Sequence, residues 1–357
     1  MPSLLDPRRR TAIYVLASFA AGALLTVALL RFGPEPLTAR PEPIAVTASA
    51  PSPASTSSGP AATSSTADAS PPADAATDQG SVDMDADAWP TDAPTPEQIF
   101  TAQPATLREA IGRLAPRTPG KPNVYAIAFG ADGSEDVFRN EAEYVDSLMT
   151  TRFGSPRHTL VLENNPASLS IRPLASWTNL EGALDGLSKV MDPREDILLL
   201  YVATHGGNDH SLLVDMDPIP LDQLDPDGLA DILGKHAFRW KVLVVNACYS
   251  GGFVPKLRGA GTLVLTSARS DRTSFGCGAD SDITYFGRAW LADGLNATPD
   301  FIEAFDKAKV EIAAWEAKDS LEASEPQIDV GAGIGEKLAA WRKAAKIGPV
   351  VPFQAAK

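Results

Sequence analysis

Cysteine and histidine are scarce in this chain. It contains two cysteines, Cys248 and Cys277, and four histidines, His158, His205, His210 and His236. Two cysteines are too few for a disulfide framework or for a zinc site built on thiolates. The scarcity also leaves few ways to pair a reactive thiol with an imidazole base.

Positive charge is scarce as well. Lys and Arg number 31 against 45 Asp and Glu, for a formal net charge of -14 at pH 7. Phosphate binding needs clustered Lys and Arg, and the one basic run is Arg8-Arg9-Arg10. The sequence therefore argues against nucleic acid as a partner. Asp209, Asp215 and Asp217 lack calcium-loop spacing, so neither a metal nor a cofactor is expected.

A single long apolar run lies near the N-terminus. Residues 11–30 read TAIYVLASFAAGALLTVALL without a charge, and a helix of that length spans a hydrocarbon core of about 30 Å. The preceding arginines place residues 1–10 in the cytoplasm. A cleavable signal peptide is the alternative, but its apolar region is usually about 7–15 residues. We therefore predict a single-pass signal anchor, with the folded domain on the periplasmic side of a bacterial inner membrane.

Large apolar residues are rare between residues 31 and 95. This segment is dominated by Ala, Pro, Ser, Thr and Asp, as in PSPASTSSGPAATSSTADASPPADAA. Such a composition cannot bury enough apolar surface to offset the entropy of ordering. We predict a disordered linker over 31–95 and a folded domain over 96–357.

Strand-like and helix-like segments alternate after residue 96. Strands are predicted at 123–130, 158–162, 197–203, 241–245, 263–268 and 327–330. Helices are predicted at 97–114, 137–149, 178–190, 224–233, 283–291 and 301–321, with Thr178 or Asn179 capping the third. This alternation predicts an α/β sandwich with a mainly parallel sheet.

Two of these strands deliver reactive side chains to glycine-containing turns. The strand at 197–203 runs into Thr-His-Gly-Gly with His205, and the strand at 241–245 runs into Asn-Ala-Cys-Tyr-Ser-Gly-Gly with Cys248. In parallel sheets, chemistry collects beyond the carboxyl ends of the strands. A lone cysteine at a strand end is commonly a small buried hydrophobe, but a histidine at the same edge favours a nucleophile–base pair. The backbone N–H groups of Gly206 and Cys248 are the candidate oxyanion donors.

These residues resemble the legumain-family cysteine peptidases, which share the caspase-like fold. The resemblance lies in a strand followed by His-Gly and a strand ending Ala-Cys-x-Ser-Gly. It continues through residues 264–277 (VLTSARSDRTSFGC), the Thr-Tyr-Phe-Gly core of 281–290, and Phe138-Arg139-Asn140-Glu141-Ala142. It covers about residues 123–295. It implies a caspase-like three-layer α/β sandwich and a cysteine-type endopeptidase acting on polypeptides.

Carried over by position, the resemblance makes Cys248 the nucleophile, which forms a thioester acyl-enzyme, and His205 its base. The residues it assigns to the substrate cleft are Arg139, Asn246, Ser267, Ser274 and Arg288. For Arg139, an ordinary solvated helix arginine is the competing interpretation. The resemblance makes Cys277 structural, and a Cys248–Cys277 disulfide would disable the enzyme.

Four positions depart from the family pattern. Legumains have Glu where this chain has Asn246 and an acid where it has Arg288, which puts asparagine specificity in question. Arg139 and Arg288 together suggest instead a pocket for an acidic side chain. Val137 replaces the asparagine that orients the family's histidine, and Thr204 replaces an acid, which weakens the case for ligase chemistry. Two alternatives remain open: acyl transfer to an amine by a transamidase, and an inactive caspase-like binding domain.

Overall fold

The computed structural model describes residues 89–278 and 281–356. The predicted anchor at 11–30 and the linker up to residue 88 lie outside the described residues. Within the described ranges, none of the helices combines the length and the hydropathy that a membrane span requires.

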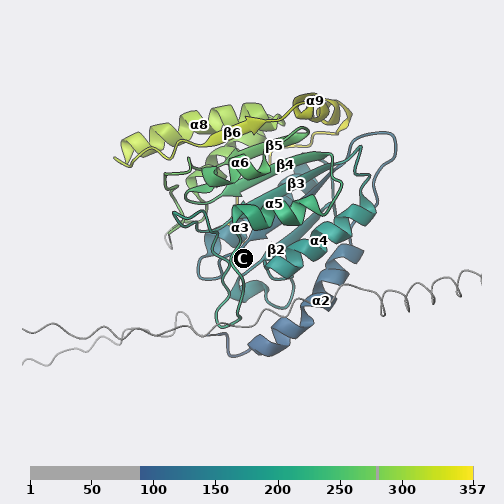
Figure 1. Cartoon of the computed structure of the whole chain (residues 1–357), viewed down its shortest axis with the longest axis vertical. Helices are drawn as coiled ribbons and strands as arrows, with labels where there is room; N and C mark the ends of the chain where they lie inside the picture. Colours follow the sequence, from purple (N-terminus) through teal and green to yellow (C-terminus); the bar gives the residue numbers. More distant parts are fainter. Residues whose placement is uncertain (1–88, 279–280, 357) are drawn as a thin grey trace, which may run out of the picture. The chain divides into compact units, whose positions relative to one another are not determined.

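One six-stranded sheet forms the centre of the described chain, in the order β2-β1-β3-β4-β5-β6 (Figure 1). The strands are β1 (Val124–Gly130), β2 (Thr159–Glu163), β3 (Ile197–Ala203), β4 (Trp240–Asn246), β5 (Thr262–Thr266) and β6 (Gln327–Val330). All neighbours are parallel except β6, which runs antiparallel to β5. Strands β1 and β3 are buried along their whole length, because both faces of the sheet are covered and their apolar runs do not alternate with polar residues.

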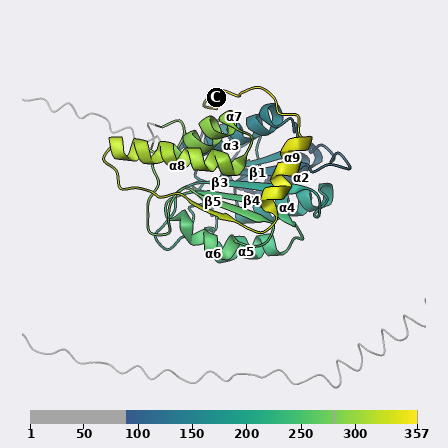
Figure 2. The same ribbon diagram turned by 90° about the horizontal axis from the view of Figure 1, so that it is seen from above.

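Helices cover both faces of this sheet (Figure 2). They are α2 (Pro96–Gly112), α3 (Asp136–Ser147), α4 (Trp177–Val190), α5 (Pro226–Gly234), α6 (Val254–Leu257), α7 (Leu295–Ala297), α8 (Phe301–Lys318) and α9 (Ile334–Ala344). Short helical segments add π-helices η1 (Leu148–Arg152) and η4 (Gly287–Gly294), and 3-10 turns η2 (Pro166–Ser168) and η3 (Ser250–Phe253). The predicted α/β sandwich with a mainly parallel sheet is confirmed.

Each face of the sheet has its own hydrophobic core. Val124, Ala126 and Ala128 of β1 pack with side chains of α3, η4, α8 and α9. The alternate residues Tyr125 and Ile127 pack with α4, α5 and α6. This alternation follows from the two-residue period of a strand.

The folded part begins earlier than predicted. Trp89 and Ala93 pack against a small cluster that includes Ile99, and Thr95 caps α2 through a reciprocal capping box with Gln98. The prediction of disorder is therefore wrong for residues 89–95, because the large indole of Trp89 buries apolar surface that the Ala- and Ser-rich stretch before it lacks.

Two helix predictions also need correction. Ser176, rather than Thr178 or Asn179, caps α4 by accepting a hydrogen bond from the Asn179 amide. The helix predicted at 283–291 overlaps the π-helical segment η4, which runs from Gly287 to Gly294. A π-helix closes hydrogen bonds over one more residue per turn, so side chains after its start face directions that an α-helical pattern does not predict.

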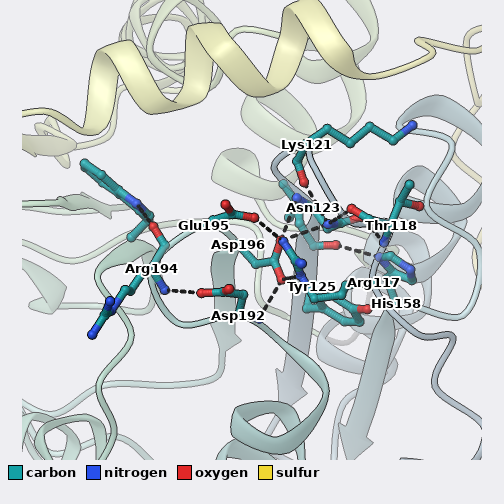
Figure 3. Close-up of polar contacts among 12 residues, drawn as sticks. Arg117, Thr118, Lys121, Asn123, Tyr125, His158, Asp192, Arg194, Glu195 and Asp196 are labelled. Atoms are coloured by element: carbon teal, nitrogen blue, oxygen red, sulfur yellow. Dashed lines mark hydrogen bonds and ion pairs between the residues drawn. The ribbon is translucent and has the colours of Figure 1, made fainter.

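A polar cluster anchors the amino-terminal edge of the sheet (Figure 3). Asp196, just before β3, accepts hydrogen bonds from Arg117 Nε at 2.8 Å, Asn123 Nδ2 at 2.8 Å and the Asp192 amide at 2.7 Å. Because Asn123 immediately precedes β1, the cluster fixes the starts of two neighbouring strands. Their opposite ends carry the candidate site.

Candidate active site

The pairing of β3 with β4 places His205 and Cys248 at matching positions. Ala203 is paired with Asn246. His205 lies two residues after Ala203 and Cys248 lies two residues after Asn246, so they occupy equivalent positions on the two strands. The Thr204 amide donates to the Asn246 carbonyl at 3.1 Å and extends the pairing by one residue. The predicted meeting of these two strand ends at one sheet edge is present in the structure.

Gly206 allows the two strand ends to approach closely. A Cβ at this position would lie 2.1 Å from the Cys248 carbonyl oxygen, a distance no side chain tolerates. Among the described residues, neither the Gly206 amide nor the Cys248 amide donates a hydrogen bond. Both N–H groups are therefore available to a substrate oxygen.

Cys248 is partly exposed, and its sulfur lies against Ser274. The Ser274 amide points at Sγ from 3.3 Å, and the Ser274 Oγ is 3.9 Å away. The Cys248 thiol also donates to the Ser274 carbonyl at 3.6 Å, so Ser274 fixes the position of the sulfur from both its amide and its carbonyl. The next residue, Tyr249, has a left-handed backbone with φ 56°, a conformation that costs free energy in a bulky residue and is typical of functional turns.

Ser267 supports this turn from inside the protein. Its hydroxyl accepts a hydrogen bond from the Ala247 amide and donates one to the Ala247 carbonyl, both at 2.9 Å. The side chain is 1% exposed, so the expectation that it lines the cleft is wrong. It holds the residue before Cys248 in place, whereas Ser274 is partly exposed beside the sulfur, and its place in the substrate cleft stays a prediction.

His205 lies between two carboxylates and an aromatic ring. Its Nε2 is 3.3 Å from Glu135 Oε2 and 3.5 Å from Asp132 Oδ2. The Phe138 ring meets the imidazole edge-on, with 5.1 Å between centroids. The histidine side chain remains 35% exposed, which leaves it accessible from the cleft.

A buried carboxylate lies beneath the site. Glu141 accepts hydrogen bonds from Tyr201 Oη at 2.6 Å, Asn246 Nδ2 at 2.8 Å and Thr284 Oγ1 at 2.7 Å. Burial raises the pKa of Glu141, and the hydrogen bonds from Thr284, Tyr201 and Asn246 oppose that rise. Asn246 is 1% exposed, so its predicted contact with substrate is wrong: its amide is used inside this network.

The two arginines predicted for the pocket point elsewhere. Arg139 is buried on α3, with its Nε 3.8 Å from Glu163 Oε1. Arg288 is exposed, and its guanidinium lies over the Phe353 ring at 5.3 Å. Because these contacts differ, they do not support the expected pairing of the two cations in an acid-selective pocket. The interpretation of Arg139 as an ordinary solvated arginine is also wrong, because the side chain is buried.

A cavity of about 770 Å³ adjoins His205 through Glu135. Its acidic lining residues are Glu135, Asp136, Asp215, Asp217 and Asp282. No Lys or Arg is among the described residues that line it. Burial, and then the neighbouring carboxylates of Asp132 and Asp217, raise the pKa of Asp215, which shows that negative charge accumulates here. In the part of the chain that the structure describes, no group of His, Cys, Asp and Glu is arranged to hold a metal ion.

Cys277 lies near the site as a second thiol. Both cysteines are free in the structure. Burial, with smaller contributions from Cys248 and Glu135, raises the pKa of Cys277 to about 11. Cys277 is therefore protonated at neutral pH. Because the thiolate is the nucleophilic form of cysteine, Cys277 does not compete with Cys248.

Sequence reasoning missed the acidic residues of the site. Asp132 and Glu135 follow β1 directly, at the same edge as His205, and the rule that chemistry gathers beyond strand ends could have indicated them. Glu141 has no such signal, because only the packing of α3 under β3 and β4 brings it to Asn246.

Comparison with known proteins gives a match to one family model, described as the Peptidase C13 family, over residues 178–336. The matched segment contains both His205 and Cys248 and begins after Asp132, Glu135 and Glu141. Among solved structures, the chain is similar to caspase-1 from Spodoptera frugiperda, with 16% identity and a TM-score of 0.43 over 61% of this chain and 95% of that chain. Curated proteins gave no match. The family match supports cysteine peptidase activity in general.

Proposed function

We propose that this protein is a cysteine endopeptidase in which Cys248 is the nucleophile and His205 is the base. The observation that supports this most strongly is the β3–β4 register, which brings the two residues to matching positions at one edge of the sheet. The family match covers the same two residues. Partial exposure of the sulfur and the imidazole allows a polypeptide to reach both.

The reaction proceeds through two displacements at one carbonyl carbon. His205 takes the thiol proton of Cys248, and Sγ attacks the peptide carbonyl while the amides of Gly206 and Cys248 bind the developing oxyanion. The C–N bond breaks as His205 returns the proton to the departing amine. Water then hydrolyses the thioester, releasing the new carboxyl end and restoring the thiol.

The charge of the cavity bears on which peptides are cleaved. Five carboxylates line it and no Lys or Arg does, among the described residues, so an acidic side chain entering it meets repulsion rather than a partner. With Asn246 used inside the protein and Arg288 directed at Phe353, neither an asparagine-type nor an acid-selective pocket is supported. We propose that the cleft accepts neutral or basic side chains.

The remaining proposals concern where the enzyme acts. Residues 11–30 form the signal anchor, residues 31–88 tether the catalytic unit, and that unit faces the periplasm. A reporter enzyme fused after residue 30 tests this topology. We expect a reporter that works only outside the cytoplasm to be active, and activity of a reporter that works only in the cytoplasm contradicts the proposal.

The full-length protein, incubated with a library of quenched fluorescent peptides, tests the reaction. Wild type and Cys277→Ala are expected to cleave, whereas Cys248→Ala and His205→Ala are not. Mass analysis of products with and without an added amine separates hydrolysis from transamidation. If a thiol-reactive peptide probe fails to label Cys248 in the folded protein, the alternative of an inactive binding domain replaces this proposal.

A further inference from the structure

Two carboxylates approach the same nitrogen of the proposed base. Glu135 Oε2 and Asp132 Oδ2 lie 3.3 Å and 3.5 Å from His205 Nε2. We infer that Asp132 and Glu135 are positioning residues, which orient the His205 ring and stabilise its protonated form. The inference rests on the proposed role of His205 and adds the group that orients it.

Asp132 is held rigidly enough to orient a ring. Its side chain is 2% exposed, and its Oδ1 accepts hydrogen bonds from the Ser134 amide at 2.9 Å and the Ser134 hydroxyl at 2.8 Å. Its backbone is bridged to Asp215. With Oδ1 engaged locally, Oδ2 is the oxygen that lies 3.5 Å from His205 Nε2.

Glu135 reaches the ring from the start of α3. It is the N-cap residue of that helix, but its side chain makes no capping hydrogen bond. Its Oε2 is buried without a hydrogen-bond partner among the described residues. An ionised oxygen in that setting is stabilised when a positive charge forms beside it, and the protonated His205 supplies that charge. Phe138, one turn later, limits rotation of the imidazole.

Val137 cannot take this role in the present chain. It occupies the position where the resembling family has an orienting asparagine, and here it is 1% exposed in the core between α3 and the sheet. The two acids therefore replace a neutral amide with negative charge. That change adds electrostatic stabilisation of the imidazolium to the orientation of the ring.

The arrangement also selects a tautomer. We assign the proton of the neutral ring to Nε2, the nitrogen beside the carboxylates, which leaves Nδ1 unprotonated to accept the proton of Cys248 Sγ. The S–H bond breaks, an Nδ1–H bond forms, and the resulting thiolate–imidazolium pair is balanced by the two carboxylates. A buried aspartate acts on histidine in the same way in serine-protease triads.

The titratable groups around this ring come from three elements. Asp132 and Glu135 belong to the segment between β1 and α3, and Cys248 follows β4. Cys277 lies in the loop after β5, and its thiol interacts with both Cys248 and Glu135. Both carboxylates lie within 3.5 Å of the imidazole, which makes His205 a cation partner of each acid when it is protonated.

The test measures the rate at which iodoacetamide alkylates Cys248 in the full-length protein between pH 5.5 and 9.5, with peptide mapping to separate Cys248 from Cys277. Variants are Asp132→Asn, Glu135→Gln, the double variant, His205→Ala and Glu135→Asp. Asp209→Asn is the matched control, because Asp209 is an exposed carboxylate of the loop after His205 that accepts hydrogen bonds from the Ser211 amide and hydroxyl and does not line the cavity.

At pH 6 we expect wild type and Asp209→Asn to react alike, each single variant about 10-fold more slowly, and the double variant about 100-fold more slowly, close to His205→Ala. All variants converge above pH 9, where the thiol ionises without help, and Glu135→Asp recovers part of the rate. General damage to the fold lowers or raises the rate at every pH and does not give this convergence.

A double variant that keeps the wild-type rate at pH 6 overturns the inference and leaves the proposed peptidase untouched. The expected carboxylate-dependent profile in a protein that cleaves no peptide supports the inference and contradicts the proposed function. A wild-type profile equal to that of His205→Ala overturns the inference, because no thiolate–imidazolium pair then exists, and the peptide-cleavage assay decides the proposed function separately.

Discussion

Buried carboxylates lie at both edges of the sheet, and the two edges treat them in opposite ways. At the amino-terminal edge, burial favours the neutral form of Asp196, but hydrogen bonds from Arg117 and Asn123 hold its pKa below the ordinary value. At the carboxyl-terminal edge, Glu141 receives hydrogen bonds from neutral donors only, and burial raises its pKa. Glu163, at the end of β2, also has a raised pKa, of about 7.

The carboxylate at the amino-terminal edge has a structural role, whereas those at the carboxyl-terminal edge have the features of a functional site. The Asp196 cluster pairs its charge and satisfies its oxygens, so it stabilises the starts of β1 and β3. The opposite edge keeps carboxylates at Asp132, Glu135 and Asp215 without a lysine or arginine in ion-pair contact, among the described residues. Uncompensated charge of this kind is typical of catalytic and binding sites.

The largest expected effect is at Gly206. Gly206→Ala places a Cβ 2.1 Å from the Cys248 carbonyl oxygen, so the two strand ends must separate and an oxyanion donor moves. We expect peptide cleavage to fall by about 100- to 1000-fold. Kinetic assays of kcat/KM against Gly207→Ala provide the comparison, because a Cβ there meets the exposed, flexible Asp209 side chain. Equal activity of the two variants contradicts the proposed geometry.

A stability effect is expected at the amino-terminal edge. Asp196→Ala removes the acceptor for Arg117, Asn123 and the Asp192 amide, and losing one partner of a buried ion pair costs about 3–5 kcal/mol of unfolding free energy. Urea denaturation measures it. Glu195→Ala is the control, because Glu195 is a half-exposed partner of the same Arg117 and such pairs contribute less than about 1 kcal/mol. Activity per folded molecule should be unchanged in both variants.

The opposite edge should show the opposite dependence of stability on pH. Because the folded pKa of Glu163 is about 7, above its ordinary value of 4.5, folding takes up a proton between these values. Stability from this group is therefore lost as pH rises from 4.5 to 7, by up to about 3 kcal/mol. Asp196 behaves in reverse, since its stabilisation is present at neutral pH and is lost in acid.

Glu163→Gln isolates this effect. The variant should match wild type below pH 4.5 and exceed its unfolding free energy above pH 7, because the amide imitates the protonated acid. Denaturation at several pH values measures the difference, and Glu109→Gln on the exposed side of α2 controls for the loss of one charge. A constant difference at every pH contradicts an elevated pKa at Glu163.

The sheet and the two reactive residues could be predicted from the sequence because they depend on local patterns. Uninterrupted apolar runs ending in glycine identify β1, β3 and β4, and the rule for parallel strand ends brings His205 and Cys248 to one edge. The surroundings of the site depend on contacts distant in sequence. The neighbour relation of β1 and β3 brings Asp132 to His205, and the helix α3 brings Glu141 to Asn246.

The residues misassigned to the cleft have separate physical causes. Asn246 and Ser267 end or follow strands, where a shift of one residue moves a side chain from the cleft to the interior. Arg288 lies in the π-helical segment η4, whose extra residue per turn redirects side chains, and Phe353 near the C-terminus provides its aromatic partner.

The smallest expected effect concerns the charge of the substrate. Peptides with Lys or Arg in the position that enters the acidic cavity should be cleaved about tenfold faster than the same peptides with Asp or Glu, since one unit charge near several carboxylates is worth about 1 kcal/mol in a solvated cleft. A positional peptide library read by mass spectrometry locates that position. Asp217→Asn should reduce the preference about twofold, and high salt should reduce it further.

The control for that preference is Asp209→Asn, which removes an exposed carboxylate of the loop after His205 that does not line the cavity. It should keep the wild-type ratio of basic to acidic substrates, because charge outside the cavity is screened by solvent and salt. A preference for acidic side chains, or an equal loss in both variants, means that the cavity carboxylates do not select the substrate. The contrast between the two sheet edges then rests on stability and thiol reactivity alone.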